Sequence, residues 1–327
     1  MTRASARWTV AVAACAALTL AVGSAQGAVA RTTQGIPVAW KANVHGRIAY
    51  ESFKGGIWTM NANGSHRRRV THARRPGVDF DPDWAPSGKQ LVFRTSRGHH
   101  LPDPQGIGVD GIFVISASGH HEHPVHPPSG GLFADWSPNG RLIVMSGVSG
   151  GVEKLFTVHP DGTHVRDLGV SGEGAEWSPD GRELAFGWHG PDEEWQVWVS
   201  RADGHDAHSL TNPPVDPQAP LGSAGDGDGL WSPDGKQLAF SRGAGDKRDF
   251  WLMNADGSDQ HRVLRWRGAD SPTVWLPNGR LVLAHEAPGA THPRWFLVNP
   301  DGTKLRSLRW LDGLAAYPLD WLVKPAG

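Results

Sequence analysis

One ten-residue stretch of this chain occurs twice in nearly identical form. Residues 177–186 read WSPDGRELAF and residues 231–240 read WSPDGKQLAF, and three looser copies begin at Trp84, Trp136 and Trp275. A sixth tryptophan, Trp321, follows an acid as Trp84 does but has no turn after it, whereas GRIAY at 46–50 resembles the second half of a copy. Self-similarity at a period of about 20–50 residues is typical of repeat architectures.

Each copy predicts two antiparallel strands joined by a tight turn. Proline fixes φ and glycine tolerates positive φ, so Pro-Asp-Gly or Pro-Asn-Gly reverses the chain after the tryptophan. A third strand and a second glycine turn follow, and a fourth strand ends the unit. The third strand keeps an aromatic side chain at one register, and the six residues at that register are Trp58, Phe113, Phe156, Trp198, Trp251 and Phe296.

A lone meander of this kind leaves two apolar faces, which only neighbouring units can cover. We therefore predict an all-β fold, a six-bladed β-propeller of four-stranded antiparallel blades. Burial of each tryptophan, about 150–250 Å² or on the order of 4–6 kcal/mol gross, is enough to explain why the residue is repeated. We expect residues 317–323 to form the innermost strand of the first blade, so that the C-terminal strand closes the ring; Val38 to Ala42 are the alternative.

The first 30 residues have the pattern of a secretory signal peptide: Arg3 and Arg7, an apolar run from Trp8 to Val22, and small residues before Arg31. We expect residues 1–30 to be this signal, 31–43 a lead-in and 44–327 the propeller, in a secreted or cell-envelope, extracytoplasmic chain. The apolar run is shorter than the roughly 20 residues of a membrane span, so no transmembrane segment is expected after cleavage. The only cysteine, Cys15, lies in the signal, which excludes disulfides from the mature chain.

These repeats resemble the TolB-type propeller repeat, also called PD40 or WD40-like, whose signature is Trp-Ser-Pro-Asp-Gly before Lys or Arg and a short apolar strand. The match covers roughly residues 44–323 and not the α/β domain that precedes the propeller in TolB. The resemblance implies the propeller fold. It also implies a binding role in the periplasm, because TolB looks like a platform on which other envelope proteins dock rather than a catalyst.

In propellers of this type the glycine turns lie on one rim, and the second-to-third strand loops and inter-blade connections lie on the other, where function usually concentrates. We call the second one the loop rim. Its candidate ligand-binding residues combine aromatic and imidazole groups that suit sugars, peptides or cations; they are Trp188, Trp195, Trp266, Trp310, His99, His100, His189 and His285. The alternative is that the tryptophans only cover the blade edges.

The residue before the inner tryptophan is acidic in four units: Asp83, Asp135, Glu176 and Asp320. Inner strands line the central channel, so these carboxylates are predicted to gather near one axis. They suit a divalent cation such as calcium, or a Lys or Arg of a partner. They are equally compatible with hydrated groups or with caps on neighbouring backbone N–H groups, in which case no cofactor is needed.

Two other motifs match a catalytic or a metal-binding pattern but lie in a structural context that does not suit it. Gly147 to Gly151, GVSGG, fits the nucleophile elbow but lies in a predicted hairpin rather than a strand-to-helix turn. His120 to His126, HHEHPVH, falls on a turn and an outer strand, where alternation directs its histidines apart instead of toward one zinc ion.

The net charge of −1 gives no reason to expect nucleic acid as a partner. The prediction is a monomeric, non-enzymatic scaffold that binds an envelope protein or peptide, or a cell-wall glycan, through its loop rim. The alternative is a metal-dependent hydrolase or lyase that uses a cation in the central channel and a loop-rim histidine as base.

Overall fold

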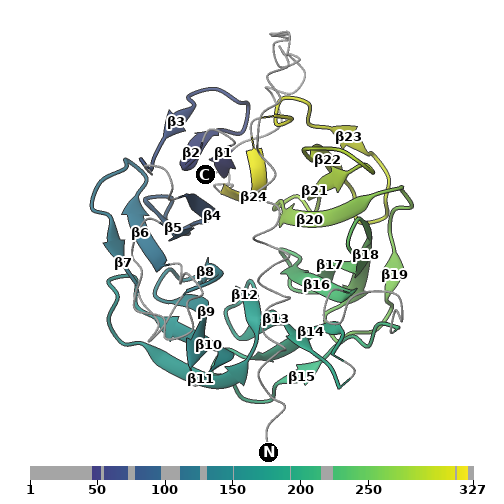
Figure 1. Cartoon of the computed structure of the whole chain (residues 1–327), viewed down its shortest axis with the longest axis horizontal. Helices are drawn as coiled ribbons and strands as arrows, with labels where there is room; N and C mark the ends of the chain where they lie inside the picture. The colour runs from purple at the N-terminus through teal and green to yellow at the C-terminus, as the bar shows by residue number, and fades with distance from the viewer. Residues whose placement is uncertain are drawn as a thin grey trace, which may run out of the picture.

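The computed structural model describes residues 46–52, 55–72, 78–96, 111–125, 131–149, 151–191, 193–214, 224–313 and 315–322. Every regular element in these ranges is a β-strand. Figure 1 shows the strands arranged in a ring, with β24, β4, β8, β12, β16 and β20 facing its centre. The predicted all-β class is confirmed.

Four strand positions recur around the ring. The inner strands are β24 (Ala315–Leu322), β4 (Asp79–Trp84), β8 (Ala134–Trp136), β12 (Glu173–Trp177), β16 (Ala224–Trp231) and β20 (Ala269–Trp275). The second strands are β1 (Arg47–Ser52), β5 (Gln90–Thr95), β9 (Ile143–Ser149), β13 (Glu183–His189), β17 (Gln237–Ala244) and β21 (Leu281–Glu286). The third strands are β2 (Ile57–Asn61), β6 (Gly111–Ser116), β10 (Val152–Val158), β14 (Trp195–Arg201), β18 (Lys247–Asn254) and β22 (Arg294–Val298). The outer strands are β3 (Arg68–Arg69), β7 (His123–Pro124), β11 (Arg166–Ser171), β15 (His208–Ser209), β19 (His261–Arg262) and β23 (Arg306–Ser307).

Neighbouring strands of a unit pair antiparallel, as the repeat predicts. Three sheets are four-stranded, in the orders β24-β1-β2-β3, β4-β5-β6-β7 and β11-β10-β9-β8. Strands β12 to β23 form one twelve-stranded sheet, because single parallel pairs join β14 to β16 at Trp195 and Gly225 and β18 to β20 at Arg248 and Ala269. The last described strand, β24, pairs with β1, with Trp321 opposite Ile48.

The repeated Ser-Pro-Asp-Gly is a hydrogen-bonded turn. Ser178 Oγ donates to Asp180 Oδ1 at 2.8 Å and accepts the Glu183 N–H at 2.9 Å, and Asp180 Oδ1 also accepts the Arg182 N–H at 3.0 Å. Gly181 completes the reversal at a φ of 71°, where only glycine is unstrained. The side chains of the motif therefore stabilise the turn from within.

The hydrophobic core is divided among the spaces between neighbouring units. One cluster joins Ile112 and Val114 of β6 to Trp136, Met145 and Phe156 of the following unit. The third-strand aromatics also keep one register, with Trp198 opposite Phe186 and Trp251 opposite Phe240. The apolar faces of each meander are thus covered by its neighbours, which is the reason the repeat predicts a ring.

Strand directions divide the molecule into two rims. The Gly-turn rim carries the turns after the inner and third strands, such as 178–182 and 202–205. The loop rim carries the second-to-third strand loops, such as 287–293, and the connections between units, such as 263–268. No helix long and apolar enough to cross a membrane occurs among the residues with described structure. The predicted signal peptide, the lead-in and the segment Val38 to Ala42 lie outside them.

Candidate functional site

Three of the predicted loop-rim residues meet at the ends of β13 and β14. The imidazole of His189 lies 4.2 Å from the ring of Trp195 and 5.7 Å from that of Trp188, measured between centroids. Its Nδ1 is 3.0 Å from the carbonyl oxygen of Glu193 in the intervening loop. All three side chains are partly exposed, so an aromatic platform faces the rim at this point.

A second pair of predicted residues meets at the loop-rim end of β20 and β21. The Trp266 ring lies 4.6 Å from the His285 ring at an interplanar angle of 75°, and 4.8 Å from Phe296. His285 Nδ1 is 2.7 Å from Asp270 Oδ1, and the side chains of His285 and Asp270 are 12% and 1% exposed. A buried carboxylate at this distance fixes the orientation of the imidazole.

Asp270 is one of three buried acids at the same position of the repeat, five residues before the inner tryptophan. Asp79, Asp226 and Asp270 all have buried side chains. Each lies opposite a different second-strand residue: Thr95, Arg242 or His285. Asp79 accepts a 2.6 Å hydrogen bond from Thr95 Oγ1 and Asp226 accepts two from Arg242. Only the third pairing is built on a titratable histidine.

The remaining loop-rim predictions divide into two groups. Trp310 packs edge to face on Trp321, 6.4 Å between centroids, and adjoins the core cluster of Val282, Leu297 and Leu308. This contact fits the alternative that it covers a blade edge. His99 and His100 lie outside the described residues.

Three of the four predicted channel acids join neighbouring inner strands. Asp320 accepts the Trp84 N–H, Asp83 accepts the Trp136 N–H and Asp135 accepts the Trp177 N–H, each through Oδ2 at 2.8 Å. Every one of these carboxylates therefore holds the following unit at its inner tryptophan. This arrangement matches the alternative of caps on neighbouring backbone groups.

The same three carboxyl groups also face one another. Burial raises the pKa of Asp83 well above its ordinary value, and the charges of Asp135 and Asp320 raise it further. Burial likewise raises the pKa of Asp135 to about 7 and the pKa of Asp320. Carboxyl groups that face one another in this way keep protons rather than all ionise together. The three residues are only partly buried and lie on inner strands, so the cluster lies beside the channel.

A carboxyl cluster that retains protons and binds backbone N–H groups is a poor set of ligands for a hard cation. Within the part of the chain that is described, no three or more His, Cys, Asp or Glu side chains are grouped to hold a metal ion. Glu176 is partly exposed on β12, with Oε2 buried. The divalent cation stays a prediction.

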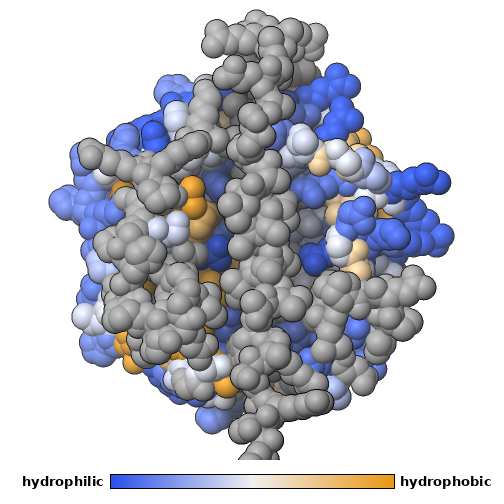
Figure 2. Space-filling model, in the orientation of Figure 1, coloured by the Kyte–Doolittle hydropathy of each residue, from blue (hydrophilic) through white to orange (hydrophobic). Residues whose placement is uncertain are grey.

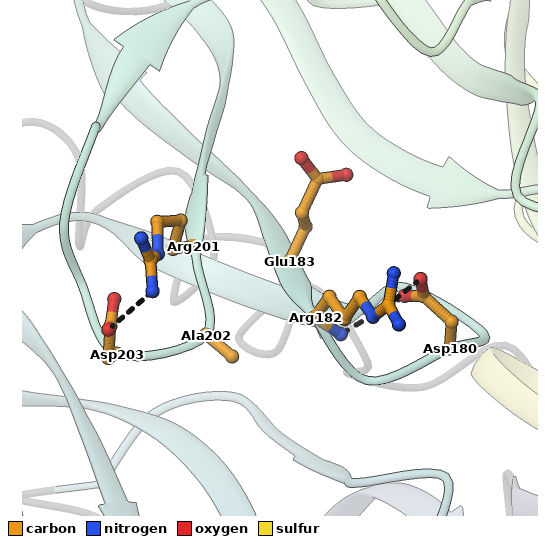
Figure 3. A pocket seen from close by; sticks show the side chains of 6 residues that line it. All are labelled: Asp180, Arg182, Glu183, Arg201, Ala202 and Asp203. Atoms are coloured by element: carbon orange, nitrogen blue, oxygen red, sulfur yellow. Dashed lines mark hydrogen bonds and ion pairs between the residues drawn. The ribbon is translucent and has the colours of Figure 1, made fainter.

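One hollow lies on the Gly-turn rim, where the sequence predicted no site. It has a volume of about 680 Å³ and is lined by Asp180, Arg182, Glu183, Arg201, Ala202 and Asp203. Figure 3 shows Arg182 directed to Asp180 and Arg201 to Asp203, at 3.7 and 3.3 Å. These two pairs neutralise each other and leave Glu183 as the one lining charge outside a pair, so the hollow is a weak candidate.

Sequence reasoning missed Asp270, although a signal was present. An aspartate stands five residues before the inner tryptophan in three units. Alignment of the units on that tryptophan therefore places the three aspartates at one position. Its histidine partner could not be found in the same way, because the pairing of Asp270 with His285 depends on the strand register, which shifts between Pro272 and Val274.

Comparison with solved structures gives the fold. A putative TolB from Agrobacterium tumefaciens superimposes with a TM-score of 0.59 at 19% identity, covering 82% of this chain and 89% of that chain. TolB from Acinetobacter baumannii also gives 0.59, at 17% identity, covering 82% of this chain and 64% of that one. A chain of a nidogen/laminin complex gives 0.58 at 11% identity, covering 85% and 99%. No family model and no curated protein sequence matches. The predicted TolB-like propeller is thereby confirmed at the level of the fold.

Proposed function

We propose that this chain is an extracytoplasmic, non-enzymatic β-propeller that binds an envelope protein or peptide, or a cell-wall glycan, through its loop rim. Its proposed architecture is six blades, the first of which is closed by β24. The pairing of Trp321 with Ile48 supports this closure, and the signal-like residues 1–30 support the location.

The observation that carries the proposal is the grouping of aromatic and imidazole side chains at two places on one rim. Trp188, His189 and Trp195 meet on one unit, and Trp266 meets His285 on another. Tryptophan next to hydrogen-bonding groups suits contacts with a partner that is partly apolar and partly polar. The Gly-turn rim, by contrast, repeats self-contained turns whose polar groups are already bonded.

The test is capture of ligands by the full chain and by a rim variant. Trp188→Ala combined with Trp266→Ala is expected to abolish binding to purified peptidoglycan or to the envelope proteins that the wild-type chain retains. Asp180→Ala combined with Arg201→Ala, on the opposite rim, is the matched control and is expected to bind as the wild type does. Unchanged binding by the tryptophan variant would remove the loop rim as the binding surface.

A further inference from the structure

Positive charge surrounds Trp266 and His285 on the loop rim. Arg265 and Arg267 flank Trp266 in the β19–β20 connection, Lys247 lies at the start of β18, and Arg294 begins β22 opposite His285; all four are exposed. Figure 2 shows hydrophilic side chains interspersed with more hydrophobic ones over the part of the ring that carries β18 to β23. This surface stands out in a chain whose net charge is only −1.

Two acids lie near some of these cations. Arg248, His285 and His292 all act on Glu286, while Arg294 and Arg309 act on Asp312. Glu286 and Asp312 are both partly buried, and burial raises the pKa of each. Asp246 is exposed beside Lys247, and Asp249 is already paired with Arg262 at 2.7 Å. The exposed cations Lys247, Arg265, Arg267 and Arg294 therefore outnumber the exposed acids of the surface.

At the middle of this surface His285 can add a directed hydrogen bond. Its Nδ1 is engaged by Asp270, and Nε2 has no hydrogen bond to any residue in the described ranges. An imidazole held this way presents Nε2–H as a charge-assisted donor to a carboxylate when protonated. Trp266, perpendicular to it, supplies an apolar neighbour.

We propose that this basic surface, composed of Lys247, Arg248, Arg265, Trp266, Arg267, His285 and Arg294, docks an acidic segment of a protein partner. The inference rests on the proposed loop-rim function and names the chemistry of the partner. Its cations come from separate loops and spread around one tryptophan. Arginine and tryptophan are enriched at the centres of protein interfaces, and spread charge of one sign steers a complementary partner.

The experiment measures fluorescence anisotropy of a labelled Glu-rich peptide titrated with the full chain at low and at moderate salt. The wild type is expected to bind it, to bind the matched Gln-rich peptide far more weakly, and to lose affinity as salt rises. Arg265→Glu combined with Arg267→Glu is expected to weaken binding about tenfold or more. Arg141→Glu combined with Arg182→Glu makes the same charge change on the Gly-turn rim and is expected to bind like the wild type.

Three outcomes would overturn the proposal. One is equal binding of the Glu-rich and Gln-rich peptides, and another is equal loss in the two charge-reversed variants, which would mean non-specific attraction. The third is binding of polygalacturonate, but not of the peptide, in a manner sensitive to Arg265 and Arg267, which would assign the surface to an acidic glycan. If the arginine variant still captures the envelope ligand that the Trp188 and Trp266 variant loses, only this inference fails and the loop-rim function stands.

Discussion

Neighbouring units are joined in one way along one arc of the ring and in another way along the other arc. From β24 through β4 and β8 to β12, the sheets are separate, and an aspartate of each inner strand accepts the backbone N–H of the next inner tryptophan. From β12 through β16 to β20, the sheets merge through single parallel backbone pairs at the loop rim. On these three inner strands the position of the aspartates is held by Glu176, Leu230 and Val274.

The difference shows that units built from the same repeat can be joined to their neighbours by two kinds of interaction. In the first arc, aspartate side chains beside the channel accept backbone N–H groups of the next unit, and the sequence shows them as acids directly before the inner tryptophans. Backbone pairs act at the opposite end of the strands and depend on close approach, which needs a small residue: a Cβ on Gly225, at a φ of 125°, would clash with the backbone of Trp195. We expect the first arc to respond to pH and the second to steric substitution.

The largest effect is expected for Gly225→Ala. An alanine forced to this φ is strained, and its Cβ meets backbone rather than a flexible side chain, so the free energy of unfolding should fall by about 3 kcal/mol. Denaturant unfolding measures the change. Gly245→Ala is the control: its φ is 55°, a Cβ there has no neighbour within 4 Å, and the expected loss is about 1 kcal/mol. Equal losses would mean that the parallel pair does not hold the units together.

The carboxylate caps are tested by Asp83→Ala. This variant leaves the Trp136 N–H without its acceptor and should cost about 1–3 kcal/mol of the free energy of unfolding. Denaturant unfolding at one fixed pH measures the change. Asp83→Asn keeps an oxygen that can accept the same N–H and should restore most of the loss. If both variants lose the same stability, capping is not the role of Asp83.

The contribution of the first arc to folding stability is also predicted to fall as the pH rises. Asp135 binds its proton more tightly in the folded chain, with a pKa of about 7, than in the unfolded chain. Such a group favours folding below the ordinary aspartate pKa of about 4, and its contribution is lost as the pH rises through its folded value. Thermal unfolding followed from about pH 4 to 8 should therefore show a steeper fall in the melting temperature for the wild type than for Asp135→Asn.

Asp301→Asn is the control for that comparison. Asp301 is exposed on the Gly-turn rim and bonded to Thr303, so its removal should leave the slope between these pH values unchanged. A slope in Asp135→Asn that equals the wild-type slope would show that Asp135 does not hold its proton in the folded chain over this pH range.

The structural features that the sequence predicts are those that recur in every repeat. The turn residues, the inner tryptophans and the third-strand aromatics recur at fixed spacing, so the four-stranded antiparallel sheets could be predicted, and they are confirmed. The meeting of Trp266 with His285 could be predicted only as far as the rim, because their loops differ in length from unit to unit. The backbone pair at Gly225 involves one residue on each strand and leaves no periodic signal.

The smallest effect is expected when an apolar residue before an inner tryptophan is replaced by one that can form a hydrogen bond, as the aspartates of the first arc do. Val274 on β20 occupies the position of Asp83 on β4, one residue before the inner tryptophan. Val274→Asn loses roughly 1 kcal/mol of apolar burial and gains an amide able to form a hydrogen bond of similar worth, so the free energy of unfolding should change by less than about 1 kcal/mol. Leu230→Asn makes the equivalent change on β16. A loss in Leu230→Asn as large as that of Asp83→Ala would mean that the junction of β16 with β20 relies on its channel side chain as strongly as the acidic arc does. Its backbone pair at Arg248 and Ala269 would then be insufficient to join the two units.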